Sequence, residues 1–216
     1  MSFQAVIFDM DGLLTDSESI GLDVIHDQGF QQGVDIPLDL IRETLGADDA
    51  SGAQMYHRFY PDLDTDRLFR DFRDAMHALA KEGKIPLKKG AVELLNALKA
   101  RNIPCAVASS SSLDTIELYL SKVNVLSYFS ALVTGAAEDI PSKPAPDIFL
   151  RAAAALGAEP EKCLVLEDSV HGVQAGRAAG MTVVMVPDMI PYSEGLAPYV
   201  DHVLPDLSAV IPLLDA

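Results

Sequence analysis

The sequence predicts an α/β fold: a doubly wound, mostly parallel sheet with a Rossmann-like core and an inserted all-helical cap subdomain. Five short apolar runs recur along the 216 residues, and each ends in polar or glycine-containing residues. Helical patterns lie between later runs, which is the order expected of parallel βαβ units. Residues 17–82 contain no strand-like run, so we expect a helical insertion after the first strand.

The predicted strands are continuous apolar segments, as is typical of strands buried on both faces of a sheet. Gly157 and Gly180 follow the last periodic residues of two predicted helices, where glycine is a common stop signal. The strands are expected at residues 5–8, 105–108, 131–134, 163–166 and 182–186, and the core helices at 91–99, 113–122, 147–156 and 170–179.

The helical insertion divides the chain into two predicted domains. Residues 1–16 and 85–216 form the Rossmann-like core domain, and residues 17–84 form the helical cap domain. The linkers are expected near residues 15–19 and 83–89. Within the cap, helices are predicted at residues 20–26, 38–44, 54–59 and 67–80.

Composition limits the partners and the compartment. The formal charge is −16, and we find no Lys/Arg cluster, so nucleic acid and anionic membranes are poor partners. No segment approaches the roughly 18 uninterrupted apolar residues of a membrane span, and the first apolar run ends at Asp9 without a basic start. We therefore expect a soluble, cytoplasmic protein, and a monomer, because no amphipathic stretch is left over. Cys105 and Cys163 lie in predicted strands and are expected to be core residues.

Acidic side chains follow two of the predicted strands. Asp9 and Asp11 come directly after the first strand, and Glu167 and Asp168 follow the fourth. Ligands of a parallel sheet bind beyond the carboxyl ends of its strands. If these two strands are neighbours, four carboxylates meet at one edge, which is costly without a cation. Oxygen ligands favour a hard ion such as Mg²⁺.

Two other strand ends offer groups suited to an anion. Four serines, residues 109–112, precede a predicted helix, and hydroxyls and free amides at a helix start favour phosphate. Ser111 and Asp114 have the spacing of a capping box, so the alternative is that Ser111 or Ser112 only caps the helix, which leaves Ser109 unexplained. Lys143 follows the third strand and precedes a proline, which favours an extended backbone. Its ammonium would bind phosphate and offset the carboxylates, although most lysines are simply solvated.

Taken together, DMDGLLTD, Ser109, Lys143 in KPAPD and the Glu167–Asp168 pair resemble the four motifs of the haloacid dehalogenase-like hydrolases. FDMDGLLTDSE, SKPAPDIF and LEDSVHGVQA are similar to the branch that contains beta-phosphoglucomutase and small sugar-phosphate phosphatases. That branch carries a helical cap after the first motif, in agreement with the predicted insertion.

The resemblance implies a role for each motif residue. Asp9 would be the nucleophile that forms an aspartyl-phosphate, and Asp11 the general acid and then the base. Mg²⁺ would be held by Asp9, the Asp11 backbone carbonyl, Asp168 and Glu167. The substrate phosphate would be bound by Ser109, Ser110, Lys143 and backbone amides around residues 10–12, including Gly12.

Other activities of the resembled family fit less well. A dehalogenase of this family does not need a second aspartate two residues after the nucleophile, so Asp11 favours phosphate chemistry. Phosphonate hydrolysis in related enzymes uses a cap lysine as a Schiff base, and no lysine lies between Ser17 and Ala80. A mutase is disfavoured because Gly21 and Asp49 stand near the positions where a His and an Arg are expected. A phosphatase of a small phosphorylated sugar or sugar alcohol is therefore preferred, with a phosphosugar mutase second and a non-catalytic phosphometabolite-binding protein third.

The cap offers several candidates for contact with the rest of the substrate. Glu18, Asp48, His57 and Arg58 would reach a sugar or would be solvated helix-surface charges. Asp16 and Glu18 border the predicted linker, where capping of the next helix is an equal alternative.

Overall fold

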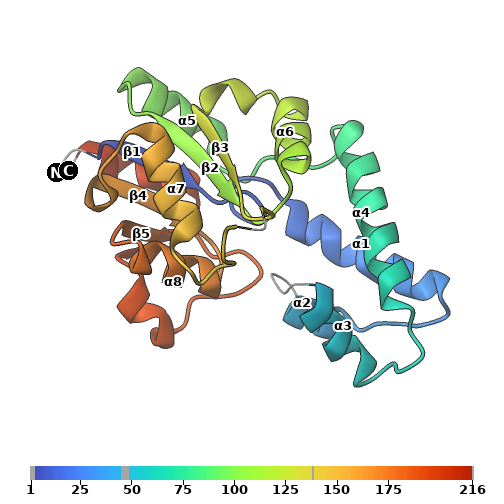
Figure 1. The fold of residues 1–216 in the computed structure, drawn as a ribbon. Helices are drawn as coiled ribbons and strands as arrows, with labels where there is room; N and C mark the ends of the chain where they lie inside the picture. The colour runs from blue at the N-terminus through green and yellow to red at the C-terminus, as the bar shows by residue number, and fades with distance from the viewer. Residues whose placement is uncertain (1–2, 45–48, 138, 216) are drawn as a thin grey trace.

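A six-stranded parallel sheet forms the centre of the computed structural model, which describes residues 3–44, 49–137 and 139–215 (Figure 1). The strand order is β3-β2-β1-β4-β5-β6, with every pair parallel. This confirms the α/β prediction. The strands are β1 (Ala5–Phe8), β2 (Cys105–Ser109), β3 (Ala131–Thr134), β4 (Cys163–Glu167), β5 (Thr182–Met185) and β6 (His202–Val203).

Helices cover both faces of this sheet. Successive residues of a strand point to opposite faces, and the apolar residues on each face pack against helices. Val6 and Phe8 of β1 pack in the larger core with α5 and α6. Ala5 and Ile7 pack in a second core with α7 and α8. The continuous apolar runs are thus explained by burial on both faces. The core helices are α5 (Ala91–Ala100), α6 (Leu113–Lys122), α7 (Asp147–Leu156) and α8 (Val170–Ala178), and the short 3-10 helices span Leu126–Tyr128, Pro160–Lys162, Glu194–Tyr199 and Leu207–Asp215.

Four helices lie between β1 and α5 and have a small core of their own (Figure 1). Tyr56 is fully buried in this core, and its hydroxyl lies 2.8 Å from that of Thr44. The first helix begins at Ser17 and continues past the predicted end at residue 26. The boundaries of the predicted cap domain, residues 17 and 84, stay a prediction. The helices are α1 (Ser17–Gln31), α2 (Leu38–Thr44), α3 (Asp49–His57) and α4 (Thr65–Lys81).

The two segments that join these helices to the sheet are hydrogen-bonded to each other. Thr15 and Leu87 form an antiparallel bridge. The Asp16 amide donates to the carbonyl oxygen of Pro86 at 2.9 Å, and the Lys88 amide donates to that of Leu14 at 3.0 Å. Entry and exit of the cap therefore lie side by side, directly after the loop that follows β1.

The structure also bears on the cysteines, on membrane-spanning segments and on one strand that the sequence did not predict. Cys105 and Cys163 are buried free thiols, as predicted. Over the described ranges, no helix has both the length and the apolar composition needed to cross a membrane. Strand β6 was missed, because His202 and Val203 are exposed and belong to no apolar run.

Candidate active site

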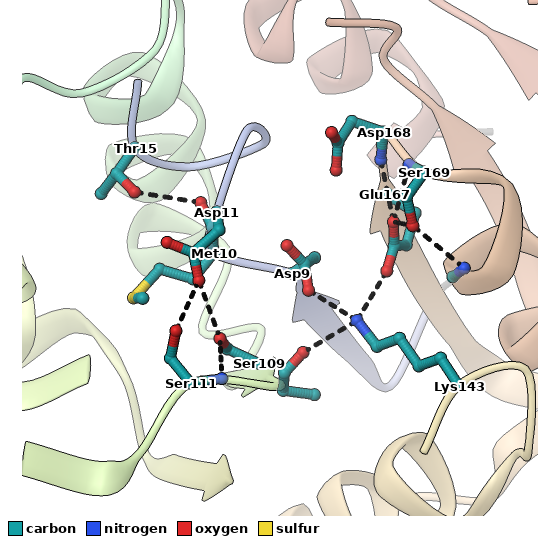
Figure 2. Close-up of polar contacts among 12 residues, drawn as sticks. Asp9, Met10, Asp11, Thr15, Ser109, Ser111, Lys143, Glu167, Asp168 and Ser169 are labelled. Carbon is teal, nitrogen blue, oxygen red and sulfur yellow. Dashed lines mark hydrogen bonds and ion pairs between the residues drawn. The ribbon is translucent and has the colours of Figure 1, made fainter. Parts of the chain in front are cut away.

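The ends of β1 and β4 bring the predicted acidic residues to one edge of the sheet. These strands are hydrogen-bonded neighbours, with Phe8 in register with Leu166. Asp9 and Asp168, which follow them, are both buried, with 7% and 4% of their surface exposed. Figure 2 shows the four acidic side chains facing a common space beyond the strand ends.

Lys143 provides the positive charge at this edge. Its ammonium donates to Asp9 Oδ1 at 2.5 Å, to Glu167 Oε1 at 2.6 Å and to the carbonyl oxygen of Ala108 at 3.4 Å (Figure 2). The same nitrogen lies 4.9 Å from the centre of the Phe149 ring. Burial lowers the pKa of Lys143, but the charges of Asp9 and Glu167 together raise it by more, so the pKa lies above its ordinary value. Lys143 is therefore a charged group held between two carboxylates.

Asp9 is hard to ionise when no cation other than Lys143 is near. Burial raises its pKa to about 7, and the charges of Glu167 and Asp11 act in the same direction, whereas Lys143 lowers it. A cation at this edge would therefore favour the ionised form of Asp9.

The Asp11 carboxylate is held by three hydroxyl groups. Ser17 Oγ donates to Asp11 Oδ1 at 2.7 Å. Ser111 Oγ and Ser109 Oγ donate to Asp11 Oδ2 at 2.8 and 3.2 Å (Figure 2). Since Ser17 begins α1, Ser109 ends β2 and Ser111 follows that strand, Asp11 connects the cap entry to the core.

Three of the four serines contact this carboxylate or cap α6. Capping of the helix by Ser111 or Ser112 was expected, and it is Ser112 that caps α6: its Oγ accepts from the Thr115 amide at 3.3 Å. Ser111 lies one residue before this N-cap, and its hydroxyl donates to Asp11 instead. Ser109 Oγ also accepts from the Ser111 amide at 3.0 Å, and Ser110 is exposed.

Glu167 is fully buried and faces two ways. One carboxylate oxygen contacts Lys143, and the other accepts from the amides of Asp168 and Ser169 and from Ser169 Oγ, each at 3.0 Å. A Cβ at Gly172 would overlap the Glu167 carboxylate, so only glycine leaves the room that this side chain occupies. Ser169 and Gly172 were not predicted as site residues, although both lie in the LEDSVHGVQA segment.

Gly12 allows the loop after β1 to approach Asp168 closely. Its φ of +84° is in the left-handed region, and a Cβ would lie 2.5 Å from Asp168 Oδ2. The Gly12 amide donates to the carbonyl oxygen of Thr15 at 3.0 Å. In this structure the contribution of Gly12 is therefore the shape of the loop, while its amide is engaged within that loop.

A further acidic side chain from the core, Asp188, was not predicted. It lies in the loop after β5, and one carboxylate oxygen each from Glu18, Asp168 and Asp188 lie within 4.8 Å of one another. Burial, followed by the charge of Asp188, raises the pKa of Glu18 to about 8. Burial and the charges of Glu167 and Asp9 raise the pKa of Asp168 as well. The available signal was position: Asp188 follows a strand end, as the predicted acids do.

The donor set fits a divalent cation. All the acidic groups at this edge offer oxygen atoms only, and their mutual repulsion is relieved when a cation lies among them. Oxygen-only sets of this kind suit Mg²⁺ rather than zinc.

The predicted cap contacts are only partly brought to the site. Glu18 reaches it from α1, whereas His57 Nε2 lies 3.0 Å from the carbonyl oxygen of Leu63 and Arg58 is exposed. Asp48 lies outside the described residues. Asp16 stands at the N-cap of α1, but its side chain makes no capping hydrogen bond there.

Comparisons with known proteins agree with this geometry. A family model described as haloacid dehalogenase-like hydrolase matches residues 3–180. The chain is 36% identical over 191 residues to a probable pseudouridine-5'-phosphatase of Drosophila melanogaster, covering 84% of this chain and 80% of that protein. It is 35% identical over 186 residues to hexitol phosphatase B of Escherichia coli K12, covering 85% and 83%.

A solved structure agrees over nearly the full length. The crystal structure of CbbY from Rhodobacter sphaeroides in complex with phosphate has a TM-score of 0.83 and 25% identity, covering 99% of this chain and all of that one. With its four motifs gathered at one sheet edge and named phosphatases among its relatives, the chain belongs to the haloacid dehalogenase-like hydrolase family and is a phosphoric monoester hydrolase.

Proposed function

We propose that this chain is a Mg²⁺-dependent phosphatase that hydrolyses a small sugar phosphate or sugar-alcohol phosphate through an aspartyl-phosphate on Asp9. The observation that carries the proposal is the buried pair of Asp9 and Lys143, 2.5 Å apart, where β1 and β4 end. A carboxylate beside a fixed cation is suited to attack a phosphorus atom whose oxygens the same cation binds.

Asp9 would act as the nucleophile. Its carboxylate oxygen forms a bond to phosphorus as the bond from phosphorus to the leaving oxygen breaks, and the covalent intermediate divides one difficult displacement into two. Lys143 and Ser109 would bind the phosphoryl oxygens. Because Glu167 holds Lys143 from the opposite side at 2.6 Å, the ammonium stays at the edge of the sheet.

Asp11 would move the protons. Its protonated carboxyl gives a proton to the leaving oxygen, and the resulting carboxylate accepts one from the water that attacks the aspartyl-phosphate. The hydroxyls of Ser17, Ser109 and Ser111 fix the orientation of this carboxylate in the present structure.

Mg²⁺ would be held by the Asp9 and Asp168 side chains and the Asp11 backbone carbonyl, with Glu167 as a nearby partner. When bound, the ion would reduce the repulsion between the attacking carboxylate and the anionic phosphoryl group. The raised pKa values of Asp9 and Asp168, caused first by burial, support a cation at this position.

The substrate class is inferred from the relatives and from the cap. One relative is named hexitol phosphatase B, and a second CbbY structure, at 25% identity, contains xylulose-(1,5)bisphosphate. These names support a small, hydroxyl-rich leaving group, and Glu18 lies where the cap faces the site. Closure of the cap would exclude bulk water from the reaction.

Two features support hydrolysis over mutase chemistry. Gly21 is buried, and an added Cβ there would contact the Phe72 ring at 3.4 Å. Asp49 is acidic and pairs with Arg73 at 2.6 Å. Neither position offers the positive group that would hold a second phosphate.

A panel of phosphomonoesters tests the proposal. The purified chain with Mg²⁺ is expected to release inorganic phosphate from hexitol or pentose phosphates, and Asp9→Asn is expected to abolish this release. Conversion of a hexose 1-phosphate to its 6-phosphate isomer would favour the mutase. A wild-type chain without turnover on any phosphomonoester would favour a phosphometabolite-binding protein.

A further inference from the structure

Lys88 lies in the linker that returns from the cap to the core, and it contacts carboxylates of two other segments. Its ammonium donates to Asp188 Oδ1 at 2.6 Å and to Asp16 Oδ1 at 3.3 Å. The side chains of Lys88 and Asp188 are 24% and 12% exposed, so their pair is largely removed from solvent. An ion pair in that setting constrains geometry more than a solvated pair does.

The two linkers are already paired through their backbones. The bridge between Thr15 and Leu87, together with the amides of Asp16 and Lys88, holds them as a short two-stranded ribbon. Lys88 therefore connects this ribbon, and with it the start of α1, to the loop after β5. Asp16 contributes a contact within the ribbon, whereas Asp188 contributes the contact to the core.

Asp188 also belongs to the acidic cluster of the candidate active site. Its Oδ2 is buried and has no hydrogen-bond partner among the described residues, and Lys88 occupies Oδ1. Glu18 and Asp168 offer carboxylate oxygens within 4.8 Å of the Asp188 group. Among the residues that the structure describes, Lys88 pairs with the acidic cluster at Asp188. Lys143 pairs with it at Asp9 and Glu167.

We propose that Lys88 is a positioning residue for the phosphatase reaction. By pairing with Asp188, it fixes the linker ribbon against the loop after β5, and this fixes Glu18 of the cap beside Asp168. Without the ammonium, the Asp188 carboxylate repels both neighbouring carboxylates, and the cap entry moves away from the edge of the sheet. This inference rests on the proposed function, because its effect is read through turnover.

The test compares substitutions at two adjacent lysines. Lys88→Met is expected to lower kcat for p-nitrophenyl phosphate with Mg²⁺ by about tenfold, since small displacements of groups that position the reacting residues have effects of at least this size. Lys88→Arg keeps the charge and is expected to restore most of the activity. Lys89→Met removes the same charge one residue further on, where the side chain is 83% exposed and pairs with Asp206, and is expected to leave kcat unchanged.

A double variant separates positioning from general stabilisation of the fold. If Lys88 acts through Asp188, then Lys88→Met combined with Asp188→Asn is expected to lose no more activity than Asp188→Asn alone. Turnover is measured at a temperature at which far-UV circular dichroism shows each variant folded. If Lys88→Met does not fold, kcat is compared between Asp188→Asn, which removes the partner of Lys88, and Lys88→Arg, which keeps the charge.

Three results would overturn the inference: full kcat in Lys88→Met, equal losses in the Lys88 and Lys89 variants, or losses at Lys88 and Asp188 that simply multiply. Wild-type turnover that Asp9→Asn abolishes measures the proposed function itself. With that turnover present, an unaffected Lys88→Met overturns the positioning role alone, whereas a wild-type chain without turnover overturns both proposals.

Discussion

Replacing Lys143 by methionine is expected to destabilise the metal-free protein in a pH-dependent way. The side chains of Lys143, Asp9 and Glu167 are 9%, 10% and 0% exposed, so the substitution leaves two buried carboxylates without their cation. Removing one partner of a buried pair costs about 3–5 kcal/mol. For a chain of this size, each kcal/mol corresponds to roughly 2–4 °C in Tm, so the expected loss at pH 8.5 is on the order of 10 °C.

The sign of the pH dependence follows from Asp9. Its pKa in the folded protein is raised from 3.8 to about 7, so the folded state holds a proton that the unfolded state has released. The stability linked to this proton is present at low pH and is lost as the pH rises through about 7. Because Lys143 lowers the pKa of Asp9, its removal raises that pKa further, so the loss of stability continues to higher pH and is larger at pH 8.5.

Thermal unfolding in EDTA, followed by far-UV circular dichroism, checks this expectation. Lys143→Met should lose more Tm at pH 8.5 than at pH 6. The control is Lys162→Met, which removes an exposed lysine paired with Glu159 at 2.7 Å and should change Tm little at either pH. An equal loss at both pH values, or a larger one at pH 6, would refute the reasoning.

Two further substitutions test the loops around the site. Gly12→Ala places a Cβ 2.5 Å from Asp168 Oδ2 and should abolish Mg²⁺-dependent turnover. Its control is Gly33→Ala, at φ +79° with open space around the Cβ. This control should lower the free energy of unfolding by about 1–2 kcal/mol through backbone strain, measured as a lower Tm, and should leave turnover intact. Ser111→Ala removes a hydroxyl that donates to Asp11, the proposed general acid, and should lower kcat and alter the pH profile of kcat. Ser112→Ala removes the N-cap of α6 and should lower Tm while kcat is unchanged. Equal effects of the two substitutions on kcat would contradict the roles assigned to these serines.

Much of the core was predictable from local pattern. The continuous apolar runs located five of the six strands. In β1, β2 and β4 every residue is buried, so these strands show no polar alternation. The register of β1 with β4 then brings Asp9 and Glu167 to the same edge, as the rule for strand ends predicts. The family followed from the same motifs.

The remaining features depend on contacts between distant segments. Glu18, Lys88 and Asp188 come together only when the cap is placed against the core, and nothing local to any of the three predicts their partners. Ser111 and Ser112 differ by one residue in helix register, and that register decides which hydroxyl caps α6 and which reaches Asp11. The end of α1 was placed too early: the helix continues to Gln31, and its buried residues include Gly29.

The central proposal is that Asp9 becomes phosphorylated at the edge where β1 and β4 end. A crystal structure of the chain with Mg²⁺ and beryllofluoride examines this most directly, because the trifluoride mimics a phosphoryl group on a carboxylate oxygen. The account predicts beryllium bonded to Asp9, with Lys143 contacting a fluorine atom. Beryllium bonded to another side chain, or an unmodified Asp9 beside a bound metal ion, would contradict it.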